Sequence, residues 1–231
     1  MREPVKTTFV VDLDGPILDG RQRHYHCYRD ILAGIGFEPL AIEHYWALKR
    51  DRVDRRRLLS LSNASAAYDQ FLAAWMERIE AESYLSLDRL QPGVREILAA
   101  WKDQGIRMVL ATMRNNPEGV RSQLDRFGIS SLLDDVLTIP SQLGAQGKAR
   151  AVEAALGPRH GNQVVWIGDT EFDFDASRQI GAKACLLACG LRSRQYLHSL
   201  DPDVLEDDLG SFARSGALET WLAGHEVTDE H

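Results

Sequence analysis

Phe9-Val10-Val11-Asp12-Leu13-Asp14-Gly15 is the stretch of sequence that decides the fold. Its apolar first half predicts a short buried strand, which ends abruptly in two acids and a glycine. Carboxylates at the end of a buried strand cost roughly several kcal/mol each unless they are paired, and a bound cation would compensate that cost. The alternative is a strand followed by an ordinary Asx-type turn, because Asp and Gly are common turn residues.

The composition restricts the class of protein. The chain has 231 residues, of which 44% are hydrophobic, so one large domain or a domain with an insertion is expected. A formal net charge of -7 argues against binding to nucleic acid or to an anionic membrane. No apolar run approaches the ~20 residues of a membrane-spanning helix, and the first residues lack the apolar core of a secretory signal. The 3 cysteines, an odd number without a CxxC pair, argue against a disulfide framework, so we expect a cytoplasmic protein.

The region from Arg21 to about Leu87 has a helical pattern. Helices are predicted over His24–Gly34, Ala41–Arg50, Arg55–Leu61 and 64–82. The last has the clearest amphipathic face, formed by Tyr68, Phe71, Leu72, Trp75 and Ile79. Because no strand pattern interrupts this region, we predict an all-helical cap domain, residues 20–87, inserted after the first strand.

From Pro92 onward, helical patterns alternate with short apolar strands. The strands are predicted over 108–111, 136–139, 164–167, 184–187 and 203–205, and the helices over 92–101, 117–127, 148–156, 173–180 and 209–222. This alternation favours an α/β fold, namely a Rossmann-like parallel sheet core with helices on both faces. Residues 1–19 and 88–231 would form that core.

Polar side chains follow three of the predicted strands directly. Asp12 and Asp14 come after the first strand, Thr112 follows another, and Asp169 follows a third. Ligands of open parallel sheets bind beyond the carboxyl ends of the strands, so we expect these side chains to meet, with Lys148 in reach of the same edge. Three acids, a hydroxyl and a lysine would suit Mg²⁺ and a phosphate group.

These residues resemble the motifs of the haloacid dehalogenase (HAD) superfamily, the aspartyl-nucleophile phosphatases. The first motif, hydrophobics and DxDG, is similar to Val10–Gly15, and the second, hydrophobics and Thr or Ser, is similar to Val109–Thr112. Lys148 matches the lone lysine of the third motif, and Gly168–Asp173 matches the GDxxxD of the fourth. The order of the motifs and the helical insertion between the first two also match.

The resemblance implies a role for each matched residue. Asp12 would be the nucleophile, and Asp14 the general acid and then the general base. Mg²⁺ would be held by the Asp12 carboxylate, the Asp14 backbone carbonyl and the Asp169 carboxylate, with Asp173 acting through water or by orienting the others. Thr112 and Lys148 would bind the oxygens of the phosphoryl group.

Three positions depart from the family pattern. Pro16 replaces the usual threonine after DxDG, Met113 replaces the asparagine that often follows the second motif, and Ala149 replaces the proline common after the lysine. The last departure leaves a solvated helix lysine as the alternative interpretation of Lys148. The basic run from Lys49 to Arg57 is interpreted as a solvated helical face, with contact to a second anionic group of the substrate as the alternative.

We therefore expect a Mg²⁺-dependent phosphatase that hydrolyses a small phosphomonoester metabolite through an aspartyl-phosphate intermediate. A phosphosugar mutase on the same fold is one alternative. A non-catalytic phosphate-binding or phospho-accepting signalling module is another, although such receiver domains are shorter and lack a helical insertion.

Overall fold

A computed structural model describes residues 7–157, 164–217 and 221 of the chain. The strands are β1 (Thr8–Val11), β2 (Leu18–Asp19), β3 (Arg89–Leu90), β4 (Arg107–Thr112), β5 (Asp135–Thr138), β6 (Val164–Gly168), β7 (Lys183–Leu187) and β8 (Val204–Glu206). The helices are α1 (Arg21–Gly34), α2 (Ile42–Arg50), α3 (Arg55–Leu61), α4 (Tyr68–Arg78), α5 (Glu82–Leu85), α6 (Val94–Asp103), α7 (Pro117–Arg126), α8 (Gly144–Leu156), α9 (Glu171–Gln179), α10 (Arg194–His198) and α11 (Leu209–Ala213).

The main sheet confirms the predicted Rossmann-like α/β fold. It is 6-stranded, in the order β5-β4-β1-β6-β7-β8, and every neighbouring pair is parallel. Numbered along the chain, the order of these strands reverses at β1, which lies between β4 and β6. Such a reversal is the switch point at which the loops beyond the strands diverge and leave room for a ligand.

Two apolar clusters cover the two faces of this sheet. Phe9 and Val11 face α6, α7 and α11, where the Phe9 and Trp101 rings meet edge to face with centroids 4.7 Å apart. Val10 and Trp166 face the opposite cluster, which is formed with α8 and α9. β1 is buried on both sides, so its sequence is continuously apolar instead of alternating.

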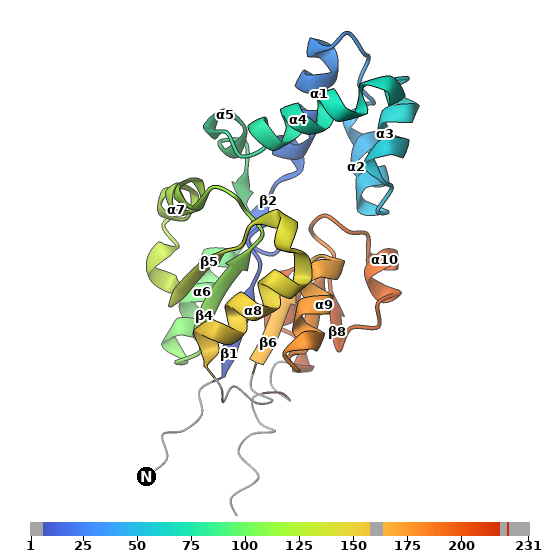
Figure 1. The fold of residues 1–231 in the computed structure, drawn as a ribbon. Coiled ribbons are helices and arrows are strands. Elements are labelled where there is room, and N and C mark those ends of the chain that lie inside the picture. The colour runs from blue at the N-terminus through green and yellow to red at the C-terminus, as the bar shows by residue number, and fades with distance from the viewer. Residues whose placement is uncertain (1–6, 158–163, 218–220, 222–231) are drawn as a thin grey trace, which may run out of the picture.

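The predicted helical cap is present between β2 and β3. Throughout residues 20–88, all of which are described, the chain forms helices and turns but no strand. Helices α1 to α4 share an aromatic cluster of their own, in which the Tyr28 and Tyr45 rings stack with centroids 4.4 Å apart. Figure 1 shows these helices gathered beyond the end of the main sheet that lies away from the N-terminus.

The two chain crossings between sheet and cap lie side by side. Leu18 pairs with Leu90 and Asp19 with Arg89, so β2 and β3 form a two-stranded antiparallel ribbon. The predicted division into residues 1–19 with 88–231 and residues 20–87 has its boundaries next to this ribbon, and stays a prediction.

Some element boundaries differ from the sequence prediction. The segment predicted as one helix over 64–82 is a short 3-10 turn, α4 and then α5, because the chain turns between Arg78 and Glu82. Pro92 precedes α6 instead of lying in its first turn, and α8 begins four residues before Lys148. The helix predicted over 209–222 ends at Ala213, and part of its remainder lies outside the described residues. None of the described helices is long and apolar enough to cross a membrane.

Candidate active site

The main carboxylate cluster lies at the switch point of the sheet, where β1 and β6 end. Asp12 follows β1 directly, and its N–H donates to the Ile167 carbonyl at 2.9 Å, which extends the ladder by one residue. Asp169 follows β6. Oxygens of Asp12, Asp169 and Asp173 all lie within 4.8 Å of one another, and all three residues are buried. Parallel pairing therefore brings together acids separated by more than 150 positions in the sequence.

Two glycines allow this close approach. A Cβ on Gly15, whose φ is +98°, would lie 2.3 Å from the Asp169 carboxyl carbon. A Cβ on Gly190 would lie 1.9 Å from an Asp169 oxygen and 2.7 Å from the Gly15 Cα. The backbone at Gly15 and Gly190 thus packs directly against the Asp169 carboxylate, where no side chain would fit. The Leu191 N–H donates to Asp169 Oδ2 at 2.5 Å.

Asp169 has one oxygen without a partner. Its Oδ1 is buried and accepts no hydrogen bond. Burial, with Asp12 and Asp173 nearby, raises the pKa of Asp169 well above its ordinary value. A hard divalent cation would satisfy an unpartnered buried oxygen in a cluster of carboxylates, so the donor set fits a metal ion.

Lys148 is buried in this site and is not on a solvated face. Its Nζ donates to Asp12 Oδ1 at 2.9 Å and to Asp173 Oδ1 at 2.6 Å. Burial lowers the pKa of Lys148, but the two carboxylates outweigh this effect and raise it above its ordinary value. Lys148 therefore presents a fixed positive charge beside the Asp12 carboxylate.

Asp173 is occupied by protein donors. Besides Lys148, its Oδ1 accepts from Trp166 Nε1 at 3.2 Å, and its Oδ2 accepts from the Thr170 hydroxyl at 2.7 Å. Thr170 and Asp173 form a capping box, which starts α9. These contacts suit a residue that holds Lys148 and the loop after β6 in place.

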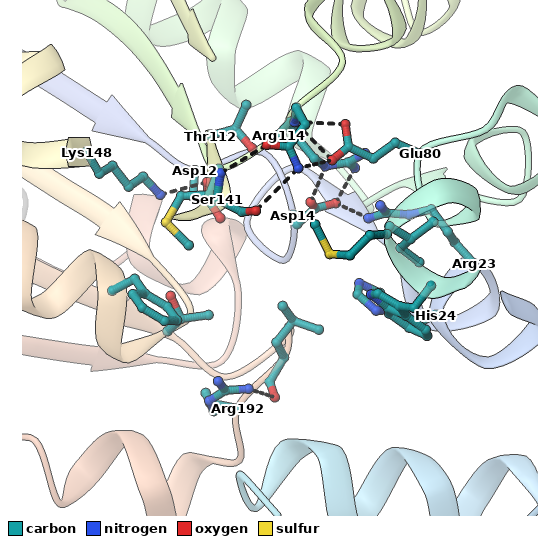
Figure 2. A pocket seen from close by; sticks show the side chains of 18 of the residues that line it. Asp12, Asp14, Arg23, His24, Glu80, Thr112, Arg114, Ser141, Lys148 and Arg192 are labelled. Carbon is teal, nitrogen blue, oxygen red and sulfur yellow. Dashed lines mark hydrogen bonds and ion pairs between the residues drawn. The ribbon is translucent and has the colours of Figure 1, made fainter. Parts of the chain in front are cut away.

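Asp14 lies between two arginines, one from each part of the molecule. Arg114, on the loop after β4, donates through Nε to Oδ2 at 2.7 Å and through Nη2 to Oδ1 at 2.8 Å. Arg23, in the first turn of α1, donates to Oδ1 at 2.5 Å and through Nε to Asp88 at 2.9 Å. Figure 2 shows Asp14 between these guanidinium groups, with Lys148 extending to Asp12 beside them.

The pKa values of the two acids of the first motif are driven apart. Burial raises the pKa of Asp12 to about 7, despite the lowering effect of Lys148. Burial would also raise the pKa of Asp14, but Arg114 and Arg23 outweigh it and lower the value to about 2. A nucleophilic Asp12 needs a low pKa so that it is ionised, and an acidic Asp14 needs a high pKa so that it carries a proton. The two pKa values are shifted in the opposite directions. Positive charge added beside Asp12, as a metal ion would add it, lowers the Asp12 pKa.

The cap is closed over the site by several contacts. Arg50 of α2 donates to the Ala188 carbonyl at 2.5 Å, and its own carbonyl accepts from the Ser193 N–H at 2.8 Å. The Glu80 carboxylate accepts from the N–H groups of Asn115 and Asn116 at 3.0 and 2.8 Å. A pocket of about 240 Å³, open to solvent, lies between cap and sheet.

The pocket is lined by residues that the sequence motifs predicted to lie together and by several further residues that no motif predicted. Asp12, Asp14, Thr112 and Lys148 all line it. Asp169 and Asp173 are fully buried and do not line the pocket. The further lining includes Arg23, Arg55, Trp75, Glu80, Arg114 and Arg192. Two of these residues have a signal in the sequence: Arg114 lies two residues after Thr112 of the second motif, and Arg55 belongs to the basic run from Lys49 to Arg57. Arg23, Trp75, Glu80 and Arg192 belong to no motif.

A protein-family comparison identifies the chain. Residues 6–181 match the model of the haloacid dehalogenase-like hydrolases. The chain therefore belongs to this family. No curated protein sequence matches it significantly.

Solved structures with the same fold cover nearly the whole chain. A protein described as a predicted phosphatase from Clostridium acetobutylicum aligns with a TM-score of 0.74 and 15% identity, over 93% of this chain and 99% of the other. A predicted phosphoglycolate phosphatase from Haemophilus somnus aligns with a TM-score of 0.70 and 20% identity, over 93% and 97%. A Thermotoga maritima protein, provisionally described as a beta-phosphoglucomutase, aligns with a TM-score of 0.61 and 18% identity, over 86% and 93%. At these identities the likeness concerns the fold.

Proposed function

We propose that this protein is a Mg²⁺-dependent phosphatase that hydrolyses a small phosphomonoester through an aspartyl-phosphate on Asp12. The observation that carries the proposal is the contact of Lys148 with Asp12 beside the buried pair Asp12 and Asp169. A fixed ammonium and a carboxylate cluster that fits a cation, both at Asp12, form the charge pattern that phosphoryl transfer requires.

In the proposed reaction, an Asp12 oxygen attacks phosphorus as the bond from phosphorus to the leaving oxygen breaks. Lys148 and the Thr112 hydroxyl hold the oxygens of the transferred group. Asp12 and Asp169 would hold the metal ion, with the Asp14 backbone carbonyl, and Asp173 would keep Lys148 in position. Bound there, Mg²⁺ would act as a Lewis acid on the phosphoryl oxygens.

Asp14 would transfer protons at the leaving oxygen and later at the attacking water. In the closed structure its carboxylate is engaged by Arg114 and Arg23, which favours the ionised form. An ionised Asp14 is ready to serve as the base for water in the second step. To serve as the acid in the first step, it has to release one of these arginines and accept a proton.

The test is release of inorganic phosphate from a chromogenic aryl phosphate, with Mg²⁺ and with a chelator. We expect turnover that depends on Mg²⁺ and is lost in Asp12→Asn. Asp103→Asn, a change at an exposed position of α6, serves as the matched control and should retain activity. Turnover that persists in Asp12→Asn would exclude Asp12 as the nucleophile.

A phosphosugar mutase is the second candidate, and the closed cap favours it. A mutase has to keep water away from the aspartyl-phosphate, and the contacts of Arg50 and Glu80 hold the cap against the loops beyond the sheet. Analysis of products from hexose monophosphates separates the two: isomerised sugar phosphate indicates a mutase, and free sugar with phosphate indicates a phosphatase. Mg²⁺-dependent phosphate binding without turnover on any phosphate ester would instead indicate a non-catalytic module.

A further inference from the structure

The cations of the pocket differ in whether they have a carboxylate partner. Arg23 and Arg114 bind Asp14, and Lys148 binds Asp12 and Asp173. Arg192 is held through two hydrogen bonds by Glu171, which also binds Arg52 of the cap. Among the pocket-lining residues that the structure describes, Arg55 is the cation without an acidic partner.

Arg55 lies on the cap side of the pocket, on the face of Trp75. Its guanidinium carbon is 5.2 Å from the centre of the Trp75 ring, and the Lys49 ammonium is 5.6 Å from the same centre. Lys49 likewise has no acidic partner within the described part of the chain. Asp54, the neighbour of Arg55 in the sequence, has its carboxylate turned to the Arg57 N–H at 2.9 Å.

Arg55 and Lys49 repel each other, and burial weakens the screening of their charges by water. Burial, followed by the charges of Arg55 and Arg192, lowers the pKa of Lys49 to about 7. His24, which lies against Trp75 with ring centres 5.7 Å apart, adds no negative charge, and its buried Nδ1 has no hydrogen-bond partner. An anionic ligand group would relieve this repulsion, and arginine suits carboxylate and phosphate equally.

Resting on the proposed function, we propose that the substrate carries a second anionic group, which binds at Arg55 on the face of Trp75. Lys49 lies near the same ring but does not line the pocket. The phosphoryl group takes the Asp12 and Lys148 end of the pocket, and the second anion takes the cap end. Because the whole pocket is about 240 Å³, the substrate class is a small metabolite with an anion at each end. A carboxylate and a second phosphate are the two chemical forms of that anion.

The test uses phosphonates, which are not hydrolysed, so it does not depend on turnover. Binding to the full chain with Mg²⁺ is measured by calorimetry for alkylphosphonates of two to five carbons, and for the same compounds with a terminal carboxylate or a terminal second phosphonate. We expect at least one doubly anionic compound to bind tenfold or more tightly than the alkylphosphonate of equal length. The better of the two series identifies the form of the second anion.

Arg55→Gln should remove this preference and change the affinity for the plain alkylphosphonates less than twofold, and Arg55→Lys should restore part of it. Arg57→Gln, on the same helix but exposed and outside the pocket, is the matched control and should retain the preference. The proposal is overturned if no doubly anionic compound is preferred, or if the preference survives Arg55→Gln. If the preference for doubly anionic compounds depends on Arg55 but the protein has no phosphatase activity, the proposed reaction is refuted and the anion site at Arg55 is supported.

Discussion

Arg114 and Asp14 form a two-bond ion pair, with Nε to Oδ2 at 2.7 Å and Nη2 to Oδ1 at 2.8 Å. The pair joins the loop after β4 to the loop after β1, and Arg23 extends it to Asp88 at the base of the cap. The side chains of Arg114, Arg23 and Asp88 are all at most 3% exposed, so little water screens these charges. Asp14, the proposed catalytic acid, therefore belongs to an ion-pair network that includes Asp88, the residue before β3.

Replacing Arg114 by methionine should destabilise the protein by about 3–5 kcal/mol, because it leaves Asp14 and Asp88 buried with one cation between them. Urea unfolding at pH 7 measures the change. Arg107→Met is the matched control, since Arg107 pairs with Asp135 where both side chains are about a third exposed, and should cost at most about 1 kcal/mol. Equal losses in the two variants would contradict this account.

Mg²⁺ should raise the melting temperature of the wild-type protein, and Asp169→Asn should abolish that shift. The reason is the buried, unpartnered Asp169 Oδ1 in a residue that belongs to the carboxylate cluster. Without metal, Asp169→Asn should be at least as stable as wild type, because it removes a buried charge from the cluster. Asp175→Asn, on the exposed side of α9, should keep the full Mg²⁺ shift. A normal shift in Asp169→Asn would exclude Asp169 as a ligand.

The stability of the metal-free protein should fall as the pH rises from about 5 to 8. Burial raises the pKa of Asp12 from 3.8 to about 7, so the folded state binds a proton in this range that the unfolded state has already lost. Stability is therefore highest below the ordinary pKa and decreases as the pH passes through 7. Asp12→Asn should remove this component, and urea unfolding in chelator at several pH values compares the two proteins. Parallel pH profiles would show that Asp12 does not titrate there.

Gly190→Ala should destabilise the protein by more than about 2 kcal/mol and weaken Mg²⁺ binding. A Cβ at this position would overlap Asp169 and approach the Gly15 backbone, which cannot move as a flexible side chain can. Gly34→Ala is the control, because no atom lies within 4 Å of its added Cβ in the last turn of α1. That change should stabilise by about 0.5–1 kcal/mol. A neutral Gly190→Ala would show that the loop has room to relax.

Glu80→Gln should weaken closure of the cap. The Glu80 carboxylate accepts hydrogen bonds from two consecutive backbone N–H groups, and an amide oxygen accepts them without the charge. Hydrogen exchange of the Asn115 and Asn116 amides should speed up about five- to tenfold, while amides of β1 stay unchanged. Glu77→Gln, at an exposed position on α4, is the control. Unchanged exchange at Asn115 and Asn116 would mean that Glu80 does not hold the cap.

The sheet and the acidic end of the site were predictable because they depend on local patterns. Each apolar run that ends in a polar residue is a strand of the observed sheet, and parallel pairing brings Asp12 and Asp169 together. Lys148 was predictable only through the family motif, since nothing in its local sequence distinguishes a buried lysine from a solvated one. The break between α4 and α5 was missed because residues 79–81 contain neither glycine nor proline to mark a helix end.

The cap contacts could not be predicted in the same way. Arg23 and Arg55 lie on helices of the cap, and Glu80 lies in the turn between α4 and α5. Periodicity indicates the helices but not what these polar side chains contact. Their partners lie in the sheet domain, as Asp14 does for Arg23 and Asn115 does for Glu80. Such pairs depend on how the cap packs on the sheet, which no local sequence pattern indicates. The basic run from Lys49 to Arg57 divides accordingly: Arg50 contacts the loop after β7 and Arg52 contacts the first residue of α9. Arg55 lines the pocket, and Arg57 is exposed.

The antiparallel ribbon of β2 and β3 also bears on how such a protein can diverge. Because Asp19 and Arg89 are paired neighbours, everything between them leaves and rejoins the sheet at one point. Lengthening, shortening or replacing that whole segment changes neither the spacing of the parallel strands nor the loops that carry Asp12 and Asp169. Selection for a new ligand can therefore act on the inserted helices while the loops that carry Asp12 and Asp169 are inherited unaltered.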